Sequence, residues 1–331
     1  MSYEPPFKII AKSINLISEI SANVERVKIN LEKSDSIKLR KVNRMKTIRG
    51  SLAIEGNSLS EEQVTALIDG KHVIAPMKEV QEVRNAIKAY ENFADFDAYS
   101  WKDLLKAHEI MAFGLVDNPG HFRKSGVCVA GKDGISHIAP PADMVQGLIT
   151  DLFEWLKNTD IHPLIKSCVF HYEFEFIHPF EDGNGRMGRL WQTVILKEWK
   201  SVFAWLPVET LIKENQAEYY KVLNSSDSLG ESTDFILFML EIILKTITQI
   251  VETEKKITVK INAKITVNQK KILEAVKQNP FLTQEELSEI VGISKLNINK
   301  NMKKLQEVGL LERIGADKNG RWQVKVDSAG K

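Results

Sequence analysis

Residues 176–191 of the chain read FIHPFEDGNGRMGRLW and gather one histidine, two acids, three glycines and two arginines into one short stretch. A hydrophobic core does not need that mixture. The residues after Gly188 place apolar side chains at helical spacing, which puts the Gly183–Gly185 turn at the N-terminus of a helix. Backbone N–H groups at such an end lack partners, and the helix dipole is positive there. The stretch therefore predicts a site for a phosphorylated ligand.

The side chains around this turn suit the same ligand. Arg186 and Arg189 are three residues apart and share a helix face, and a guanidinium group can bind phosphate oxygens with two hydrogen bonds. Asp182 supplies a hard oxygen for magnesium, which commonly bridges phosphates. His178 is placed to act as a base, although a lone histidine is more often a hydrogen-bonded structural residue. Glycines in the turn let the backbone approach a phosphate closely.

Two glycine patterns resemble other nucleotide-binding motifs and fail on their context. Residues 126–132, GVCVAGK, match a P-loop up to its last position, but Asp133 stands where a serine or threonine should bind magnesium. Residues 183–188, GNGRMG, match the dinucleotide-binding spacing, and the preceding FHYEFEF, residues 170–176, alternates as a strand would. Residues 178–182 interrupt that unit, because its strand should run directly into the first glycine.

The composition describes a globular protein, and 331 residues favour two or three domains. A net charge of +1 gives no bulk attraction to nucleic acid or acidic membranes. With only Cys128 and Cys168, a disulfide framework is not expected, and a reducing cytoplasm is favoured. The most apolar segment, residues 235–244, is too short to span a bilayer and contains Glu241, so it predicts a buried helix and no membrane association.

Helical periodicity dominates the chain and predicts a mainly α protein. Ser60 with Gln63 predicts a capping box, and Gly70 would end that helix. Residues 125–141 are the clear hairpin candidate, because Asp133–Gly134 favours a tight turn. Further helices are predicted from residue 9 to about 54, from 77 to about 93 and from 144 to 156.

The last part of the chain has the pattern of a winged helix-turn-helix domain. Residues 251–265 are charged and weakly apolar and are interpreted as the connection to it. Its signals are a capping box at Thr283 and Glu286, a turn at Gly292, a helix cap at Ser294 and a terminal hairpin at Asn319–Gly320.

The charge of this region fits DNA without requiring it. Residues 264–331 contain 13 Lys and Arg residues against 8 Asp and Glu residues, a local excess of 5 positive charges. A winged helix used for protein contacts or for a homodimer is an equal alternative. On the candidate recognition helix, the side chains that could meet base edges and phosphates are Asn297, Asn299, Lys300, Lys303 and Lys304.

Residues 178–189, HPFEDGNGRMGR, resemble at every defining position the signature of the Fic family, His-Pro-Phe-x-Asp/Glu-Gly-Asn-Gly-Arg/Lys-x-x-Arg. The resemblance implies a mostly helical bundle that moves AMP from ATP to a hydroxyl side chain of a protein. It also implies that His178 is the base and that Asp182 is the magnesium ligand. The implied phosphate cradle is Gly183, Asn184 and Gly185, and the residues that hold the triphosphate are Arg186 and Arg189.

A second resemblance lies upstream, where SLAIEG, residues 51–56, fits the inhibitory pattern Ser/Thr-x-x-x-Glu-Gly/Asn of many Fic proteins. Ser51 and Glu55 are four residues apart on one helix face, and Gly56 would end the helix. We expect the Glu55 carboxylate to pair with Arg189 and so to block productive binding of ATP. Ser51 would fix the helix end by a hydrogen bond to the loop.

The predicted hairpin resembles the Fic flap. Over residues 126–141 its exposed edge could pair with the backbone of a target protein as an added strand. The stretch GHFR, residues 120–123, precedes it as it does in the family. Gly185 distinguishes the sequence from relatives that have lysine there and act as kinases, so AMP transfer is favoured over phosphoryl transfer.

Together these features predict an N-terminal helical region with the inhibitory motif over residues 1–95, a Fic catalytic core over 96–250 and a winged helix-turn-helix domain over 262–331. The leading hypothesis is a cytoplasmic, magnesium-dependent protein adenylyltransferase that uses ATP and modifies a target protein or itself. The alternatives are a nucleotide-sensing DNA-binding regulator, and a Fic-type enzyme that removes AMP or transfers another phosphate-linked group. Neither the target nor the preferred nucleotide base can be read from the sequence.

Overall fold

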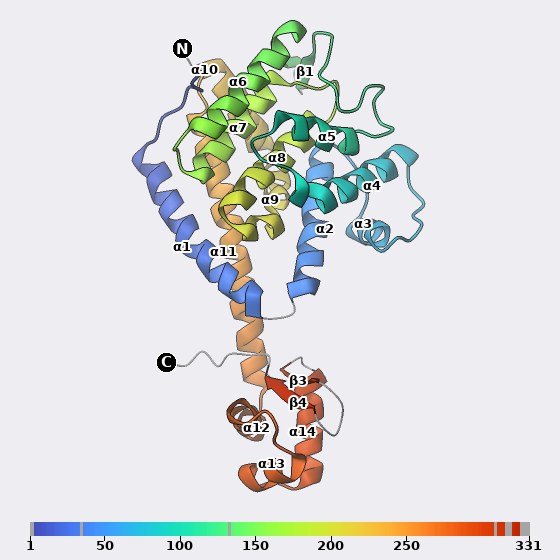
Figure 1. Ribbon diagram of the computed structural model, residues 1–331, viewed down its shortest axis with the longest axis vertical. Coiled ribbons are helices and arrows are strands. Elements are labelled where there is room, and N and C mark those ends of the chain that lie inside the picture. Colours follow the sequence, from blue (N-terminus) through green and yellow to red (C-terminus); the bar gives the residue numbers. More distant parts are fainter. Residues whose placement is uncertain (1–2, 34–35, 132–133, 308–309, 315–319, 325–331) are drawn as a thin grey trace. The chain divides into compact units, whose positions relative to one another are not determined.

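The structure is a computed structural model that describes residues 3–33, 36–131, 134–307, 310–314 and 320–324 (Figure 1). The chain divides into two compact units, residues 1–25 with 37–248 and residues 26–36 with 249–331. The described part is mainly helical, as predicted. A boundary between residues 95 and 96, inside the larger unit, stays a prediction.

Helices build the larger unit, and those predicted from the sequence are confirmed. The capping box at Ser60 and Gln63 is present at the start of α3. The long helices that lie wholly or partly in this unit are α1 (Ala11–Lys33), α2 (Ser36–Ile54), α3 (Glu61–Ile68), α4 (Met77–Asn92), α5 (Trp101–Met111), α6 (Val145–Asn158), α7 (Pro163–Ile177), α8 (Asn184–Trp199), α9 (Val208–Glu214), α10 (Gln216–Leu229) and α11 (Thr233–Lys264). Short 3₁₀ turns occur at Phe93–Asp95, Ala142–Met144 and Ser201–Trp205.

Helices α7 and α8 pack against each other in the core of the larger unit (Figure 1). Phe170 and Phe174 of α7 and Trp191 of α8 are fully buried. The strand-like pattern of residues 170–176 was misleading, because these residues lie within α7. On a helix buried on nearly every side, polar residues such as His171 and Glu173 are buried too, so an alternation of apolar and polar residues does not indicate a strand.

The predicted hairpin is present. Strands β1 (Cys128–Gly131) and β2 (Gly134–Ile138) pair antiparallel, with an irregularity between Val129 and Ala130. Beyond the strands, Ala139 N–H donates to the Val127 carbonyl at 3.3 Å and extends the pairing toward the core. Asp133, part of the predicted tight turn, lies outside the described residues.

Helix α11 contains the most apolar segment of the chain. Phe235, Met239 and Ile243 are fully buried, which confirms the predicted buried helix. The helix continues to Lys264, so almost all of the segment 251–265, interpreted as a connection, is helical. Within the residues that the structure describes, no helix is both long and apolar enough to cross a membrane.

The smaller unit ends in three helices and a two-stranded antiparallel sheet. They are α12 (Val267–Gln278), α13 (Gln284–Val291), α14 (Lys295–Glu307), β3 (Leu311–Ile314) and β4 (Arg321–Val324). These elements enclose their own core, which includes Ile272, Leu287, Ile298, Met302 and Leu311.

The helix caps and the turn predicted in this unit are confirmed. Thr283 and Glu286 form the predicted capping box, and Gly292 has a φ of +76° at the predicted turn. Ser294 Oγ accepts a hydrogen bond from the backbone N–H three residues later at 3.4 Å. The terminal hairpin pairs as expected, although Asn319 itself lies outside the described residues.

Candidate active site

His178 follows the last residue of α7 in a left-handed conformation, with φ 49° and ψ 61°. Among the described residues it is the only one besides glycines with positive φ. This conformation costs an L-residue about 1 kcal/mol or more, so surrounding bonds must hold it. Its N–H donates to the Phe174 carbonyl at 2.9 Å, and its Nδ1 lies 3.3 Å from the Glu175 carbonyl oxygen. With a proton on Nδ1 donated to that carbonyl, Nε2 is the basic nitrogen of the ring.

The loop between α7 and α8 is shaped by the buried side chain of Asn184. Its Oδ1 accepts from Phe180 N–H and its Nδ2 donates to the Phe180 carbonyl, both at 2.9 Å. These two bonds fix the amide within the loop and leave the backbone N–H of Asn184 at the start of α8. Gly183 has a φ of +88° and α8 starts directly after it, so the first N–H groups of α8 lie at the loop without helical partners.

A second histidine, His108 of α5, supports this loop, and sequence analysis missed it. Its Nδ1 accepts from Gly120 N–H at 2.9 Å, so its Nε2 carries the proton and donates to the Asp182 carbonyl at 3.0 Å. The ring stacks on Phe180 with the centroids 3.7 Å apart. Burial lowers the pKa of His108 to about 4, which keeps the ring neutral at pH 7, as this bonding pattern requires. The one sequence signal near this contact is the GHFR stretch that begins at Gly120.

Asp182 and Arg186 form an ion pair across the first turn of α8. Arg186 Nη2 donates to Asp182 Oδ1 at 3.1 Å, and Gly183 N–H donates to the same oxygen at 2.6 Å. The Nε and Nη1 atoms of Arg186 are buried without an acceptor among the described residues. Each buried donor left unpaired costs on the order of 1–3 kcal/mol. The site therefore fits an anionic ligand such as a phosphate group.

Asp182 also suits a magnesium ion shared with that ligand. Its carboxylate is 48% exposed and lies beside the unpaired donors. Within the described part of the chain, no group of three or more His, Cys, Asp or Glu side chains could hold a metal by itself. Magnesium fits here in its usual protein mode, with one carboxylate and the phosphates of a nucleotide as ligands.

Arg189 is buried and paired with Glu55, as expected from the sequence. Arg189 Nη2 donates to Glu55 Oε1 at 2.6 Å. The prediction of a hydrogen bond from Ser51 to the loop is wrong. Both oxygens of Ser51 instead accept hydrogen bonds from Arg189: Nε donates to Oγ at 3.1 Å and Nη2 donates to the carbonyl at 3.0 Å. Burial alone would lower the pKa of Arg189, but Glu55 raises it and the net effect is upward. The guanidinium therefore stays charged.

Gly185 and Gly56 make this pair sterically feasible. A Cβ atom on Gly185 would lie 2.3 Å from Glu55 Oε1 and 3.0 Å from Arg189 Nη1, so a side chain there would displace the carboxylate. Gly56 has a φ of +92° just after α2, which is the predicted helix end. Gly185 of the 183–185 turn thus contacts the carboxylate of Glu55 at the end of α2.

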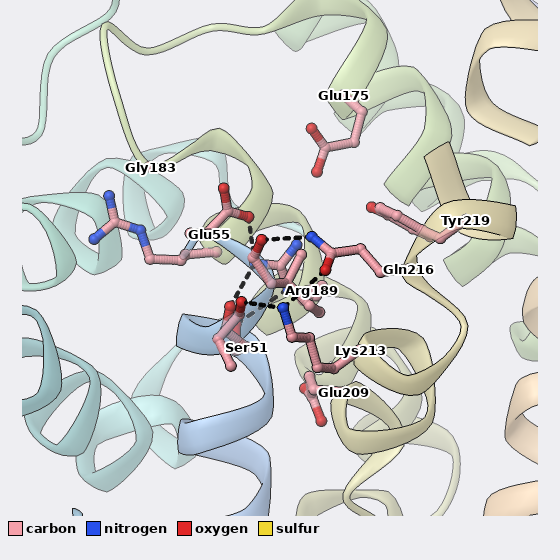
Figure 2. Close-up of polar contacts among 12 residues, drawn as sticks. Ser51, Glu55, Glu175, Gly183, Arg189, Glu209, Lys213, Gln216 and Tyr219 are labelled. Carbon is pink, nitrogen blue, oxygen red and sulfur yellow. Dashed lines mark hydrogen bonds and ion pairs between the residues drawn. The ribbon is translucent and has the colours of Figure 1, made fainter. Parts of the chain in front are cut away.

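Two side chains from other helices hold the end of α2 in place (Figure 2). Lys213 of α9 donates from Nζ to the Ala53 carbonyl, and Gln216 of α10 donates from Nε2 to the Ile54 carbonyl, both at 2.7 Å. Lys213 Nζ also donates to Gln216 Oε1 at 2.8 Å. The last carbonyls of a helix lack partners and carry partial negative charge, so a cation and an amide donor both stabilise them. These contacts position Glu55 without touching it.

Two further acids near Arg189 were missed in the sequence. Figure 2 shows Glu175 and Glu209 on either side of it. Burial raises the pKa of Glu209 to about 7. Burial also raises the pKa of Glu175, but His171, whose Nε2 lies 3.6 Å from Glu175 Oε1, and nearby positive charges outweigh this, and the net shift is downward. No sequence pattern marks them, because acids within helices are usually solvated.

Known proteins match both parts of the chain. Residues 98–196 match the model of the Fic/DOC family, and residues 265–312 match that of winged helix-turn-helix DNA-binding domains. A Fic family protein of known crystal structure, from Desulfovibrio desulfuricans G20, is 41% identical, with a TM-score of 0.74 over 99% of this chain and 100% of that protein. This chain belongs to the Fic family. The predicted Fic-type helical fold with a hairpin and a C-terminal winged-helix region is confirmed.

Curated relatives of this Fic protein are similar over somewhat more than half of its length. The protein adenylyltransferase Fic of Aedes aegypti is 28% identical over 58% of this chain, and protein adenylyltransferase fic-1 of Caenorhabditis elegans is 30% identical over 57%. The chain spans 38% and 37% of their lengths, respectively. A Fic domain containing signaling protein from Bacteroides thetaiotaomicron, 16% identical with a TM-score of 0.58 over 72% of this chain and 95% of that one, shares the fold. The roles of the individual site residues stay predictions.

Removing the side chains that hold the end of α2 should loosen it locally. In the double variant Lys213→Met with Gln216→Ala, hydrogen exchange of the Gly56 and Asn57 amides should accelerate about tenfold, because both amides bond within this last turn. Exchange in α3 should not change. Lys221→Met is the matched control, since it removes a charge from an exposed lysine of α10 that bonds Glu218 and not α2. Equal exchange in the double variant and the control would contradict the assignment.

Proposed function

We propose that this Fic-family chain is a protein adenylyltransferase that moves AMP from ATP to a serine, threonine or tyrosine hydroxyl of a protein. The observation that carries the proposal is the pair of unpaired, buried donors of Arg186 at the N-terminus of α8, next to His178. That arrangement suits a polyphosphate with a base beside it. Relatives that match somewhat more than half of the chain carry the name protein adenylyltransferase, which supports the same reaction.

In the proposed reaction, the residues of the site position the two substrates, neutralise the phosphate charge and move one proton. His178 Nε2 accepts the proton of the target hydroxyl, whose oxygen attacks the α-phosphorus of ATP. The new P–O bond forms as the bond to the β-phosphate oxygen breaks, and pyrophosphate leaves. The N–H groups of the 183–185 turn and the guanidinium of Arg186 stabilise the phosphate charge. Magnesium, when bound by Asp182 and the phosphates, supplies further charge neutralisation.

Glu55 restrains this activity in the proposal. Its carboxylate occupies the Arg189 donors that would otherwise bind the terminal phosphates, and its negative charge opposes an incoming triphosphate. ATP would bind productively only in the fraction of molecules in which Glu55 has withdrawn. Modification of the protein by itself, a cytoplasmic setting and docking of the target on the hairpin 126–141 belong to the same proposal.

The reaction class can be tested with ATP labelled at either the α- or the γ-phosphate, incubated with the purified protein and a cell lysate. We expect protein-bound label from the α position alone. His178→Ala should lower this transfer at least about a hundredfold while leaving nucleotide affinity within a few-fold, because other residues form the phosphate site. Label from the γ position would indicate a kinase. Loss of AMP from prelabelled protein would indicate the reverse reaction, and no label from either position would favour a nucleotide-sensing regulator.

Releasing Arg189 should raise transfer. Glu55→Gly should increase the initial rate about tenfold or more, and Glu55→Asp should increase it less, because a shorter carboxylate still bears the charge. Adding Arg189→Ala to Glu55→Gly should cancel the gain, since the released guanidinium is its source. Thermal unfolding of each variant controls for stability. Equal rates for the wild-type protein and a folded Glu55→Gly variant would refute restraint by Glu55.

A second activity, DNA binding by the smaller unit, is supported by its match to winged helix-turn-helix DNA-binding domains. The exposed side chains of α14 that fit this role are Asn297, Asn299, Lys300, Lys303 and Lys304. Their amides and ammonium groups can meet base edges and phosphates of a duplex. A protein partner or a second copy of the chain is the alternative occupant of this face.

Changing Lys303 and Lys304 to Ala in the full chain should weaken binding to duplex DNA. The slope of log affinity against log salt should become shallower by about 2, because two phosphate contacts are lost. The matched control changes Lys270 and Lys271 to Ala, which are exposed on α12. If the full chain shifts no duplex at low salt, the smaller unit serves protein contacts.

A further inference from the structure

Arg123 is a buried arginine, 2% exposed, whose guanidinium donates to backbone carbonyls. Its Nε donates to the His178 carbonyl at 2.8 Å, and its Nη2 donates to the Ile177 carbonyl at 3.3 Å. Its Nη1 donates to the Ser125 carbonyl at 2.8 Å, and Nη2 also donates to the Pro140 carbonyl at 2.5 Å. One planar group therefore bonds four carbonyls, and none of these acceptors is a carboxylate.

The four carbonyls belong to two parts of the site. Those of Ile177 and His178 stand at the C-terminal end of α7, where helix carbonyls lack partners and the dipole is negative. Those of Ser125 and Pro140 stand where the hairpin leaves and rejoins the core. The cation thus satisfies a helix end on one side and fixes both ends of the hairpin on the other.

The backbone of Arg123 adds to the same connection. Its N–H donates to the Pro179 carbonyl at 2.9 Å, so Arg123 bonds three consecutive residues, 177–179, around the left-handed His178. The Ala139 N–H bond to the Val127 carbonyl closes the base of the hairpin next to these contacts. Arg123 therefore contributes both to the conformation around His178 and to the place of the hairpin.

We propose that Arg123 is a positioning residue that fixes the hairpin 126–141 relative to His178. A target strand paired with the hairpin would then present its hydroxyl to the base in a single register. The register matters because a slip of one residue moves a strand by about 3.3 Å and turns its side chains to the opposite face. The part of this inference that concerns the target rests on the proposed adenylyltransferase function, whereas the restraint on the hairpin does not.

A lysine at position 123 should not be able to make all the contacts of Arg123. An ammonium group has its three donors on one atom, whereas the guanidinium spreads five donors along a rigid plane. A lysine can keep the charge and reach either the α7 carbonyls or the hairpin carbonyls, but not both sets. Arg123→Lys therefore separates the effect of the geometry from that of the charge, and Arg123→Met removes both.

Hydrogen exchange of the full chain tests the restraint directly. In Arg123→Met and Arg123→Lys, the Ala139 amide at the base of the hairpin should exchange at least about tenfold faster, while amides of α8 and α11 keep their rates. Lys124→Met is the matched control, because it removes an exposed charge one residue away. Faster exchange of equal size in all elements would mean that Arg123 only stabilises the fold, and would overturn the inference. Unchanged exchange at Ala139 would overturn it too.

Transfer kinetics test the positioning of the target. The probe is ATP labelled at the α-phosphate, with the chain modifying itself in a Glu55→Gly background. Arg123→Lys should lower the maximal rate about tenfold to a hundredfold with the KM for ATP within about twofold, because misplacing a reacting group slows transfer without altering the phosphate site. An unchanged rate in a variant with a loosened hairpin would refute the positioning role. If the Glu55→Gly parent transfers no AMP, the proposed function fails, and the exchange experiment still decides whether Arg123 restrains the hairpin.

Discussion

The buried charge of Arg189 is the constraint on which the site depends. A guanidinium group removed from water needs acceptors for its N–H groups and compensation of its charge, because leaving such a charge uncompensated in a protein interior costs several kcal/mol. Glu55 supplies the compensating charge, and the two oxygens of Ser51 accept two further hydrogen bonds. The end of α2 therefore lies against the proposed phosphate site. Under the proposed function, a triphosphate and Glu55 would compete for the same guanidinium group.

Hydrogen bonds from side chains to backbone carbonyls, mostly at helix ends, connect the other segments of the site. Arg123 satisfies the carbonyls that end α7, and Lys213 with Gln216 satisfies those that end α2. His108 acts on the loop in the same way, through the carbonyl of Asp182. In each case a side chain from one segment bonds the backbone of another, so these contacts depend on where the backbone passes and not on the side chains at the receiving positions.

This explains which features could be predicted from the sequence. The capping box at Thr283 is local, so a few neighbouring residues determine it. The pairing of Glu55 with Arg189 was predicted across 134 positions because both ends lie in recognisable family motifs. Lys213 and His108 were missed, because a bond to a distant carbonyl leaves no mark at the residue that accepts it. The strand-like run 170–176 misled for a different reason, since α7 is buried on most of its faces and lacks the exposed polar face that reveals a helix.

Gly185 takes part in two features of the site, the contact with the Glu55 carboxylate and the turn over residues 183–185. Every substitution there adds a Cβ atom where the Glu55 carboxylate now lies, so the Glu55 side chain would have to turn away from Arg189. The contacts that Ser51, Lys213 and Gln216 make at the end of α2 do not involve this position. A single exchange at Gly185 would therefore change the ion pair and the proposed phosphate-binding turn together while α2 stays in place.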